Sequence, residues 1–185
     1  DRRYLQSESP EMTQEPATPW RRIGAYLLDY CLFIIPLLAL LALAGWGLTT
    51  LKLSPFGDNP WVNQALGILA LTAPVVLYFA LSEASRLQAT LGKRMMKVSV
   101  VDKSGRRANL KQTLMRAVGK LLPWECFHTM AWRWDGWPTN PSPPTSMQVI
   151  GLSVIWLVIV WFLVCLFVGS RCTPYDFVAD TVVVR

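Results

Sequence analysis

Residues 21–51 read RRIGAYLLDYCLFIIPLLALLALAGWGLTTL, with 22 uncharged residues from Tyr30 to Leu51. A helix of that length rises about 33 Å, enough to cross a hydrocarbon core about 30 Å thick. Asp29 would then lie about two turns inside a spanning helix that begins near Arg22. Because an isolated carboxylate at such a depth costs roughly 2.5–3.5 kcal/mol, we expect Asp29 to be protonated, paired or in contact with water.

The composition of the whole chain also predicts a membrane protein. Of its 185 residues, 52% are hydrophobic and only 16% are charged, against about 25% charged residues in soluble domains. The apolar residues gather in long runs instead of recurring with a helical period, which is typical of spanning segments. The net charge of +6 does not predict a nucleic-acid partner, because the basic residues concentrate in one segment between spans.

We therefore predict an all-α membrane protein, a small bundle in which the chain crosses the bilayer four times. The expected spans are residues 23–51, 61–81, 113–134 and 147–169. The third span is the hardest to assign, because it contains Glu125 and His128 and would be kinked at Pro123. The alternative is three crossings with an interfacial helix, whose basic side chains would extend to the lipid headgroups.

Residues 82–112 form a strongly basic segment between the second and third spans. From Ser82 to Lys120 the chain has ten Lys and Arg residues, opposed only by Glu83 and Asp102. The positive-inside rule places this segment, and with it the N-terminus, in the cytoplasm of a bacterial inner membrane. Anionic lipid headgroups attract such bases by about 1 kcal/mol each. The candidates for this contact are Lys93, Arg94, Lys103, Arg106 and Arg107.

Two segments outside the spans have recognisable patterns. Residues 1–19 are polar and contain several prolines, which predicts a disordered cytoplasmic tail. Residues 96–101 alternate like a strand, and after a turn residues 106–108 could return as its partner in a short cytoplasmic β-hairpin. Because an isolated hairpin is marginal in water, we expect it to lie against the membrane domain or the C-terminal segment.

Three segments carry recognisable motifs in a fixed order. They are residues 20–29 (WRRIGAYLLD), residues 90–102 (TLGKRMMKVSVVD) and residues 175–184 (YDFVADTVVV). Together they resemble the RDD family of bacterial membrane proteins, which is named for one arginine and two aspartates. The resemblance covers most of the chain from residue 20 onward. It departs from the family pattern at Leu91, which replaces a proline, and at Tyr175 and Asp180, which replace a histidine and a glycine.

The resemblance implies that Arg22, Asp29 and Asp176 are the name-giving residues. It also implies a transport role, with ion–proton exchange suggested for some members. In a functional interpretation the three residues form a cation or proton site at the cytoplasmic end of the bundle, where a desolvated Asp29 exchanges its proton. In a structural interpretation Arg22 bridges the two carboxylates and fastens the C-terminal segment to the first helix.

Glu125 and His128 form a second candidate site, because a spacing of three places them on one helix face. They could act as a proton relay, or as a hydrogen-bonded pair that lets two polar groups enter a kinked helix. With Cys126 nearby a metal site is the weaker alternative, since mixed ligands on one segment are not a strong metal signature. His128 is the single histidine of the chain, and we expect no metal or other cofactor.

Motifs for nucleotide hydrolysis or nucleophilic catalysis do not occur in the sequence, so we do not expect an enzyme. The leading hypothesis is an inner-membrane protein for ion or proton-coupled transport, acting as a homo-oligomer. The alternative is a non-catalytic accessory or assembly subunit of a larger membrane complex. In either case the expected partners are the lipid bilayer, its anionic lipids and other membrane subunits.

Overall fold

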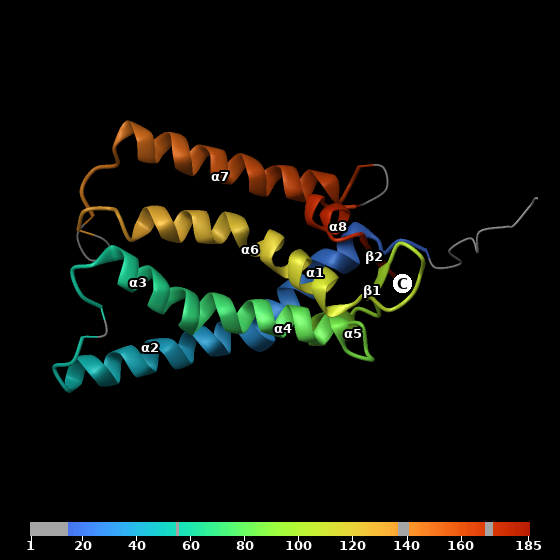
Figure 1. Ribbon diagram of the computed structural model, residues 1–185, viewed down its shortest axis with the longest axis horizontal. Helices are drawn as coiled ribbons and strands as arrows, with labels where there is room; N and C mark the ends of the chain where they lie inside the picture. Colours follow the sequence, from blue (N-terminus) through green and yellow to red (C-terminus); the bar gives the residue numbers. More distant parts are fainter. Residues whose placement is uncertain (1–14, 55, 137–140, 169–171) are drawn as a thin grey trace, which may run out of the picture.

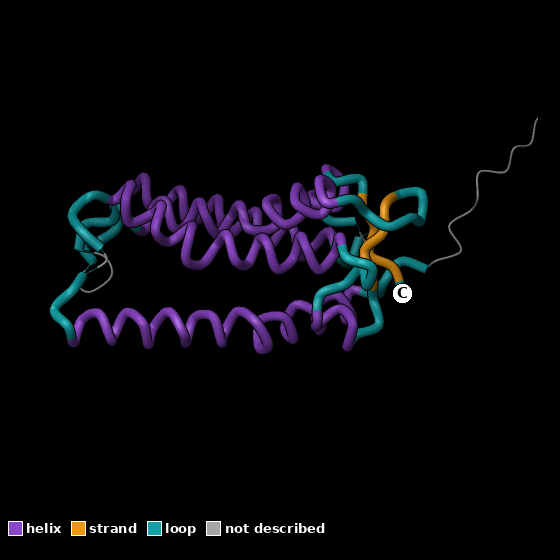
Figure 2. Tube along the Cα trace, turned by 60° about the horizontal axis from the view of Figure 1, so that its bottom comes forward, coloured by secondary structure: helices purple, strands orange, loops and turns teal. Residues whose placement is uncertain are grey.

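The computed structural model describes residues 15–54, 56–136, 141–168 and 172–185. Long helices run along the molecule, and a small sheet lies at one end (Figures 1 and 2). Three helical stretches are long and apolar enough to cross a membrane, namely Pro19–Thr50, Pro60–Ala84 and Ser146–Cys165. The protein is therefore a multi-pass membrane protein, and these stretches match three of the four predicted spans to within a few residues.

The first two stretches each contain a wider helical turn next to a proline. In the first, the π-helical turn η1 (Tyr30–Ile34) joins α1 (Pro19–Asp29) to α2 (Ile35–Thr50), just before Pro36. The second has the same order, with its elements α3 (Pro60–Gly67), η2 (Ile68–Thr72) and α4 (Ala73–Ala84). Proline lacks an N–H donor and its ring meets the carbonyl four residues back, so a wider turn relieves the clash.

The helix α6 (Leu110–Ala131) occupies most of the predicted third span. It begins at a capping box, in which the side chains of Asn109 and Gln112 accept hydrogen bonds from each other's backbone N–H, and it continues through Pro123 as one helix. It runs beside α4 and next to α7 (Ser146–Cys165) (Figure 1). The α2–α3 and α6–α7 connections lie together at the end of the bundle opposite the sheet, which we call the loop end.

The sheet differs from the predicted hairpin. Strand β1 (Ser99–Asp102) pairs antiparallel with the C-terminal strand β2 (Thr181–Val184), with Ser99 opposite Val184. The predicted return strand, residues 106–108, makes only one bridge, from Arg107 to Val101. The hairpin prediction was wrong because β2 brings buried valines to the pairing, whereas the two arginines at 106 and 107 stay exposed.

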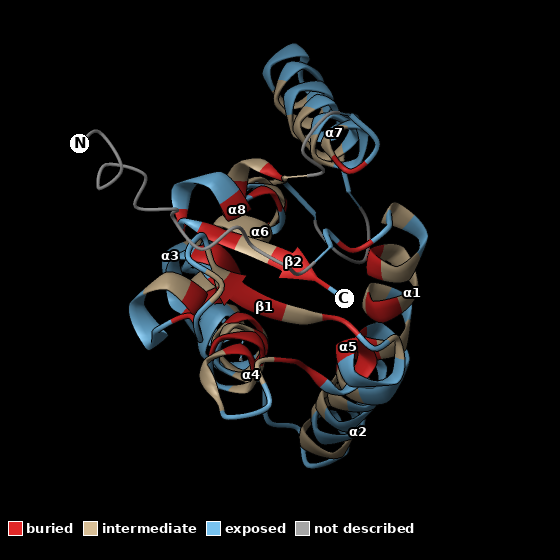
Figure 3. Cartoon of the chain, turned by 90° about the vertical axis from the view of Figure 1, so that its right-hand side faces the viewer, coloured by how far each residue is buried: buried red, intermediate tan, exposed pale blue. Residues whose placement is uncertain are grey.

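Short helices and the N-terminal segment cover this end of the bundle, which we call the sheet end (Figure 3). The helices are α5 (Leu91–Met95) and α8 (Pro174–Val178). Residues 15–19 were predicted as the last part of a disordered tail. Instead, residues 15–17 lie along β2, where the Ala17 N–H donates to the Val183 carbonyl at 2.9 Å, and Pro19 begins α1. Residues 1–14 of that predicted tail lie outside the described residues.

Candidate functional site

Charged side chains gather in the interior at the sheet end. They come from five different helices, and together we call them the buried charge network: Arg22, Glu83, Lys93, Arg116, Lys120 and Asp176. Five of the six are at most 5% exposed. A buried charge is tolerated only when it is paired and hydrogen-bonded, so the contacts within the network decide whether this end of the bundle is stable.

Arg116 holds the centre of the network. Its Nε lies 2.9 Å from Glu83 Oε2, and its Nη1 contacts Asp176 Oδ1. Arg22 contacts the other oxygen of Asp176, and Lys93 contacts Glu83 Oε1. The chain of ion pairs therefore connects five helices, namely α1, α8, α6, α4 and α5.

Asp29 lies in a separate site beside the network and is 1% exposed. Its Oδ1 accepts hydrogen bonds from the Tyr78 hydroxyl at 2.7 Å and the Gly92 N–H at 2.8 Å. Its Oδ2 accepts one from the Thr90 hydroxyl at 2.7 Å. Neutral donors therefore satisfy this buried carboxylate and fasten α5 to α1.

Arg22, Asp29 and Asp176, the three residues that the resemblance implies, do not form one site in the structure. Arg22 pairs with Asp176, as the structural interpretation predicts, and Asp29 is held by the hydroxyl and amide donors instead. Glu83 and Arg116 complete the network, and the sequence reasoning missed both. One signal was available for Glu83, because it is one of only two acidic residues among the ten bases of residues 82–120.

The predicted lipid-contacting bases do not all reach the surface. Lys93 is 5% exposed and paired with Glu83, so its assignment to lipid headgroups was wrong. Burial lowers the pKa of its ammonium group to about 8, although the neighbouring Glu83 favours the charged form. The other predicted bases are exposed at the sheet end: Arg94, Lys103, Arg106 and Arg107.

Glu125 and His128 on α6 form a second polar cluster, at the contact between α6 and η2. His128 Nδ1 lies 3.4 Å from Glu125 Oε1, which also accepts a hydrogen bond from the Thr72 hydroxyl. Glu125 Oε2 is buried and has no hydrogen-bond partner within the described part of the chain. In the same part, no three His, Cys, Asp or Glu side chains are grouped as metal ligands.

Polar contacts continue from this cluster toward the loop end. The Gln64 amide donates to the Thr129 hydroxyl at 2.6 Å, and Arg133 donates to Gln64 Oε1 at 2.9 Å. Polar side chains therefore follow the α6 interface from the sheet end to the loop end, within a bundle whose outer surface is apolar.

Comparisons with known proteins identify a family and one relative. The sequence pattern of the RDD family matches residues 16–180. Over 121 residues, the chain is 25% identical to YxaI, an uncharacterized protein of Bacillus subtilis (strain 168), and the match covers 59% of this chain and 78% of that protein. No solved structure matches the chain at a significant level.

Proposed function

The chain belongs to the RDD family, and we propose that it moves protons or cations across a bacterial inner membrane. The observation that carries this proposal is the Glu125–His128 pair in the second half of α6. Ionisable side chains within membrane helices are rare and generally mark ion pathways or proton relays. The alternative of a purely structural pair does not account for the buried Glu125 oxygen that lacks a partner among the described residues.

The proposal requires α6 to be a fourth crossing. This helix has 22 residues, about 33 Å at 1.5 Å per residue. It starts at the sheet end, and its connection to α7 lies beside the α2–α3 connection at the loop end (Figure 1). Since α2 and α3 belong to spanning stretches, α6 covers a comparable path. The basic residues 82–112 favour a cytoplasmic sheet end and an extracytoplasmic loop end.

The geometry suits proton transfer between Glu125 and His128. The free Glu125 oxygen can take up a proton while the other oxygen keeps its bond from Thr72. An imidazole can bind or release a proton within the physiological pH range, and its Nδ1 faces the same carboxylate. The buried charge network then supplies fixed charges at the cytoplasmic end of this path.

Flux measurements on the full chain in proteoliposomes test the proposal. With a pH-sensitive dye inside and imposed proton, Na⁺ or K⁺ gradients, Glu125→Gln should reduce proton flux about 100-fold or more, because a positioned proton-transfer group contributes on that order. Asp180→Asn changes an exposed carboxylate and serves as the matched control, which should keep wild-type flux. Wild-type proton and cation fluxes in both Glu125→Gln and Asp29→Asn would rule the transport proposal out.

A second candidate function is that of a non-catalytic accessory or assembly subunit. The observation that favours it concerns α7, which is described over its whole length and has no buried residue. Its exposed Trp156 and Trp161 would suit a helix of a partner subunit. Native mass measurement after mild detergent extraction separates the proposals, because a homo-oligomer favours transport and a foreign subunit at fixed stoichiometry favours the accessory role.

We also propose that the exposed bases at the sheet end contact anionic lipids. Arg94, Arg106 and Arg107 are exposed, and Lys103 is half-exposed while it pairs with Asp180 at 2.6 Å. These positions fit a membrane surface on the cytoplasmic side, where such bases are attracted by the negative surface potential.

A further inference from the structure

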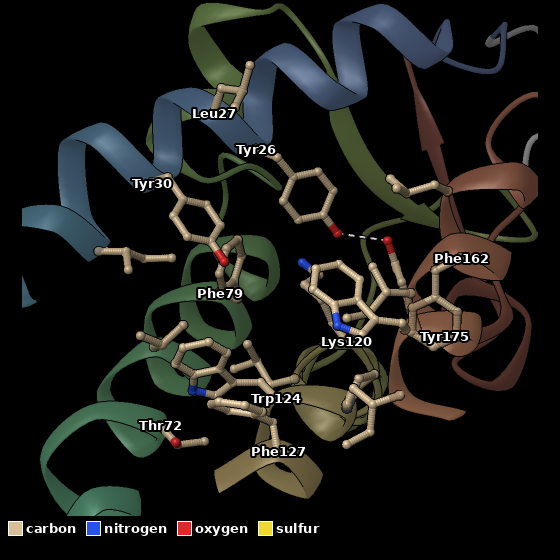
Figure 4. Close-up of a pocket in the computed structure, with 18 of the residues that line it drawn as sticks. Tyr26, Leu27, Tyr30, Thr72, Phe79, Lys120, Trp124, Phe127, Phe162 and Tyr175 are labelled. Atoms are coloured by element: carbon tan, nitrogen blue, oxygen red, sulfur yellow. Dashed lines mark hydrogen bonds between the residues drawn. The ribbon is translucent and has the colours of Figure 1, made fainter. Parts of the chain in front are cut away.

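A large apolar cavity separates α7 from the rest of the bundle. It has a volume of about 590 Å³ and is lined by side chains of α1, α4, α6 and α7 (Figure 4). Figure 3 shows α7 standing apart from the other helices. The face that α7 turns to the cavity carries Leu152, Ile155, Ile159 and Phe162, and Leu166 follows at the end of the helix. Apolar residues with this spacing normally pack against another helix.

One charged side chain enters this apolar cavity. Among the described residues that line it, Lys120 is the charged one, and its side chain is only 8% exposed. Its ammonium nitrogen lies 3.9 Å from the ring centroid of Phe79 and 5.0 Å from that of Tyr26. The Tyr26 and Tyr175 hydroxyls, 2.7 Å apart, belong to residues of the same lining (Figure 4).

The Lys120 ammonium is not satisfied by its neighbours. It has no hydrogen-bond partner in the described parts of the chain, and the carboxylate oxygen with which it forms an ion pair, Glu83 Oε1, is 3.7 Å away. That oxygen already accepts a hydrogen bond from the ammonium group of Lys93. Aromatic faces stabilise a cation, but they do not replace the hydrogen bonds that an ammonium makes in water.

The charge balance of the network points to a missing anion. Its two carboxylates are shared among four cations, and the two arginines and Lys93 make the closer contacts with them. Asp29, outside the network, is already held by three donors. A protonated Lys120 is therefore a surplus positive charge in a region of low dielectric constant, where binding a monoanion would stabilise the charged form.

We propose that this cavity binds a long-chain fatty acid, with its carboxylate on Lys120 and its acyl chain along α7. The ammonium is enclosed by rings and is the single charge of the described lining, which suits one compact carboxylate better than a glycerophosphate headgroup. From Leu166 to Leu152 the lining extends about 21 Å along the helix, a length that accommodates an extended acyl chain. The site goes beyond the proposed transport function and does not involve Glu125 or His128.

Binding of radiolabelled palmitate to the full chain in nanodiscs of zwitterionic lipid tests this proposal. Lys120→Met keeps the length of the side chain and removes the charge, so palmitate should bind about tenfold more weakly or worse. Lys120→Arg restores the charge and should restore most of the affinity. Lys111→Met changes an exposed lysine of the same helix and should bind like the wild type. Uncharged hexadecanol should compete poorly with palmitate for the wild-type protein, and markedly better for Lys120→Met, in which palmitate has lost its charged partner.

A second variant tests the cavity without touching the charge. Ile159→Trp places a larger side chain in the lining and should abolish palmitate binding, whereas Val160→Trp, on the exposed face of α7, should not. Should Lys120→Met fail to fold, the pair on α7 decides the question. Unchanged palmitate binding in Ile159→Trp would overturn the proposal. So would displacement of palmitate by equimolar phosphatidylglycerol, since a phospholipid would then be the occupant. Glu125→Gln should bind palmitate normally, so failure of the transport proposal would leave this result intact.

Discussion

Replacing Gly92 by alanine is expected to destabilise the protein strongly. A Cβ atom at this position would lie 2.2 Å from the Ala25 carbonyl oxygen, 2.8 Å from the Asp29 backbone nitrogen and 2.9 Å from the Asp29 carboxyl carbon. Two of these atoms belong to the backbone of α1, which cannot turn aside as a flexible side chain can. We expect a loss of about 3 kcal/mol or more, at the upper end of the usual overpacking cost.

Thermal unfolding in detergent, followed by tryptophan fluorescence, measures this effect. For a chain of this size a loss of that magnitude lowers the Tm by about 6 °C or more. Gly45→Ala is the matched control, because a Cβ there meets nothing within 4 Å and alanine favours the helix by up to about 1 kcal/mol. If Gly92→Ala and Gly45→Ala melted at the same temperature, α5 would not lie against α1 as described.

The close approach at Gly92 also explains what the sequence could predict about Asp29. A carboxylate two turns inside a spanning helix must find partners, and that requirement follows from the sequence alone. The identity of the donors does not, because Tyr78, Thr90 and Gly92 are at least 49 residues away along the chain. The resemblance supplied a charged partner, whereas hydroxyl and amide groups hold this carboxylate.

The helices were more predictable than the sheet for a similar reason. Long apolar runs are local signals, and they placed three spans to within a few residues. The predicted third span, which began at residue 113, likewise begins close to the first residue of α6, Leu110. The partner of β1, in contrast, is the strand that buries the most apolar side chains when it pairs with β1. The turn at residues 102–105 favoured the neighbouring segment, but the valines of β2 offered more burial from the far end of the chain.

The buried charge network was only partly predictable, because most of its ion pairs join different helices and the sequence does not show which helices meet. The motifs gave Arg22 and Asp176, which the structure brings together. Lys93 belongs to a basic segment and was interpreted as a surface residue, since the sequence alone did not show that Glu83 draws it inward. Arg116 lies in the helix for which an interfacial position was the alternative to a crossing. In that alternative its side chain would extend to the lipid headgroups.

Arg116→Met is the second variant with a large expected effect. Arg116 is 1% exposed and contacts both carboxylates of the network, Glu83 on α4 and Asp176 on α8. Methionine fills similar space, so the main change is the loss of a cation between two buried anions. Breaking a buried ion pair from one side costs about 3–5 kcal/mol, and we expect the free energy of unfolding to fall by that amount.

Denaturant titration in mild detergent, with Lys103→Met as the control, measures this difference. Lys103 and Asp180 form an ion pair whose side chains are 51% and 67% exposed, and removing such a pair changes stability by less than about 1 kcal/mol. The double variant Arg116→Met/Glu83→Gln removes one of the uncompensated carboxylates along with the arginine. It should be less destabilised than the sum of its two single variants, because the two residues are directly coupled. Additive losses, or an Arg116→Met variant as stable as Lys103→Met, would show that Arg116 does not balance the buried carboxylates.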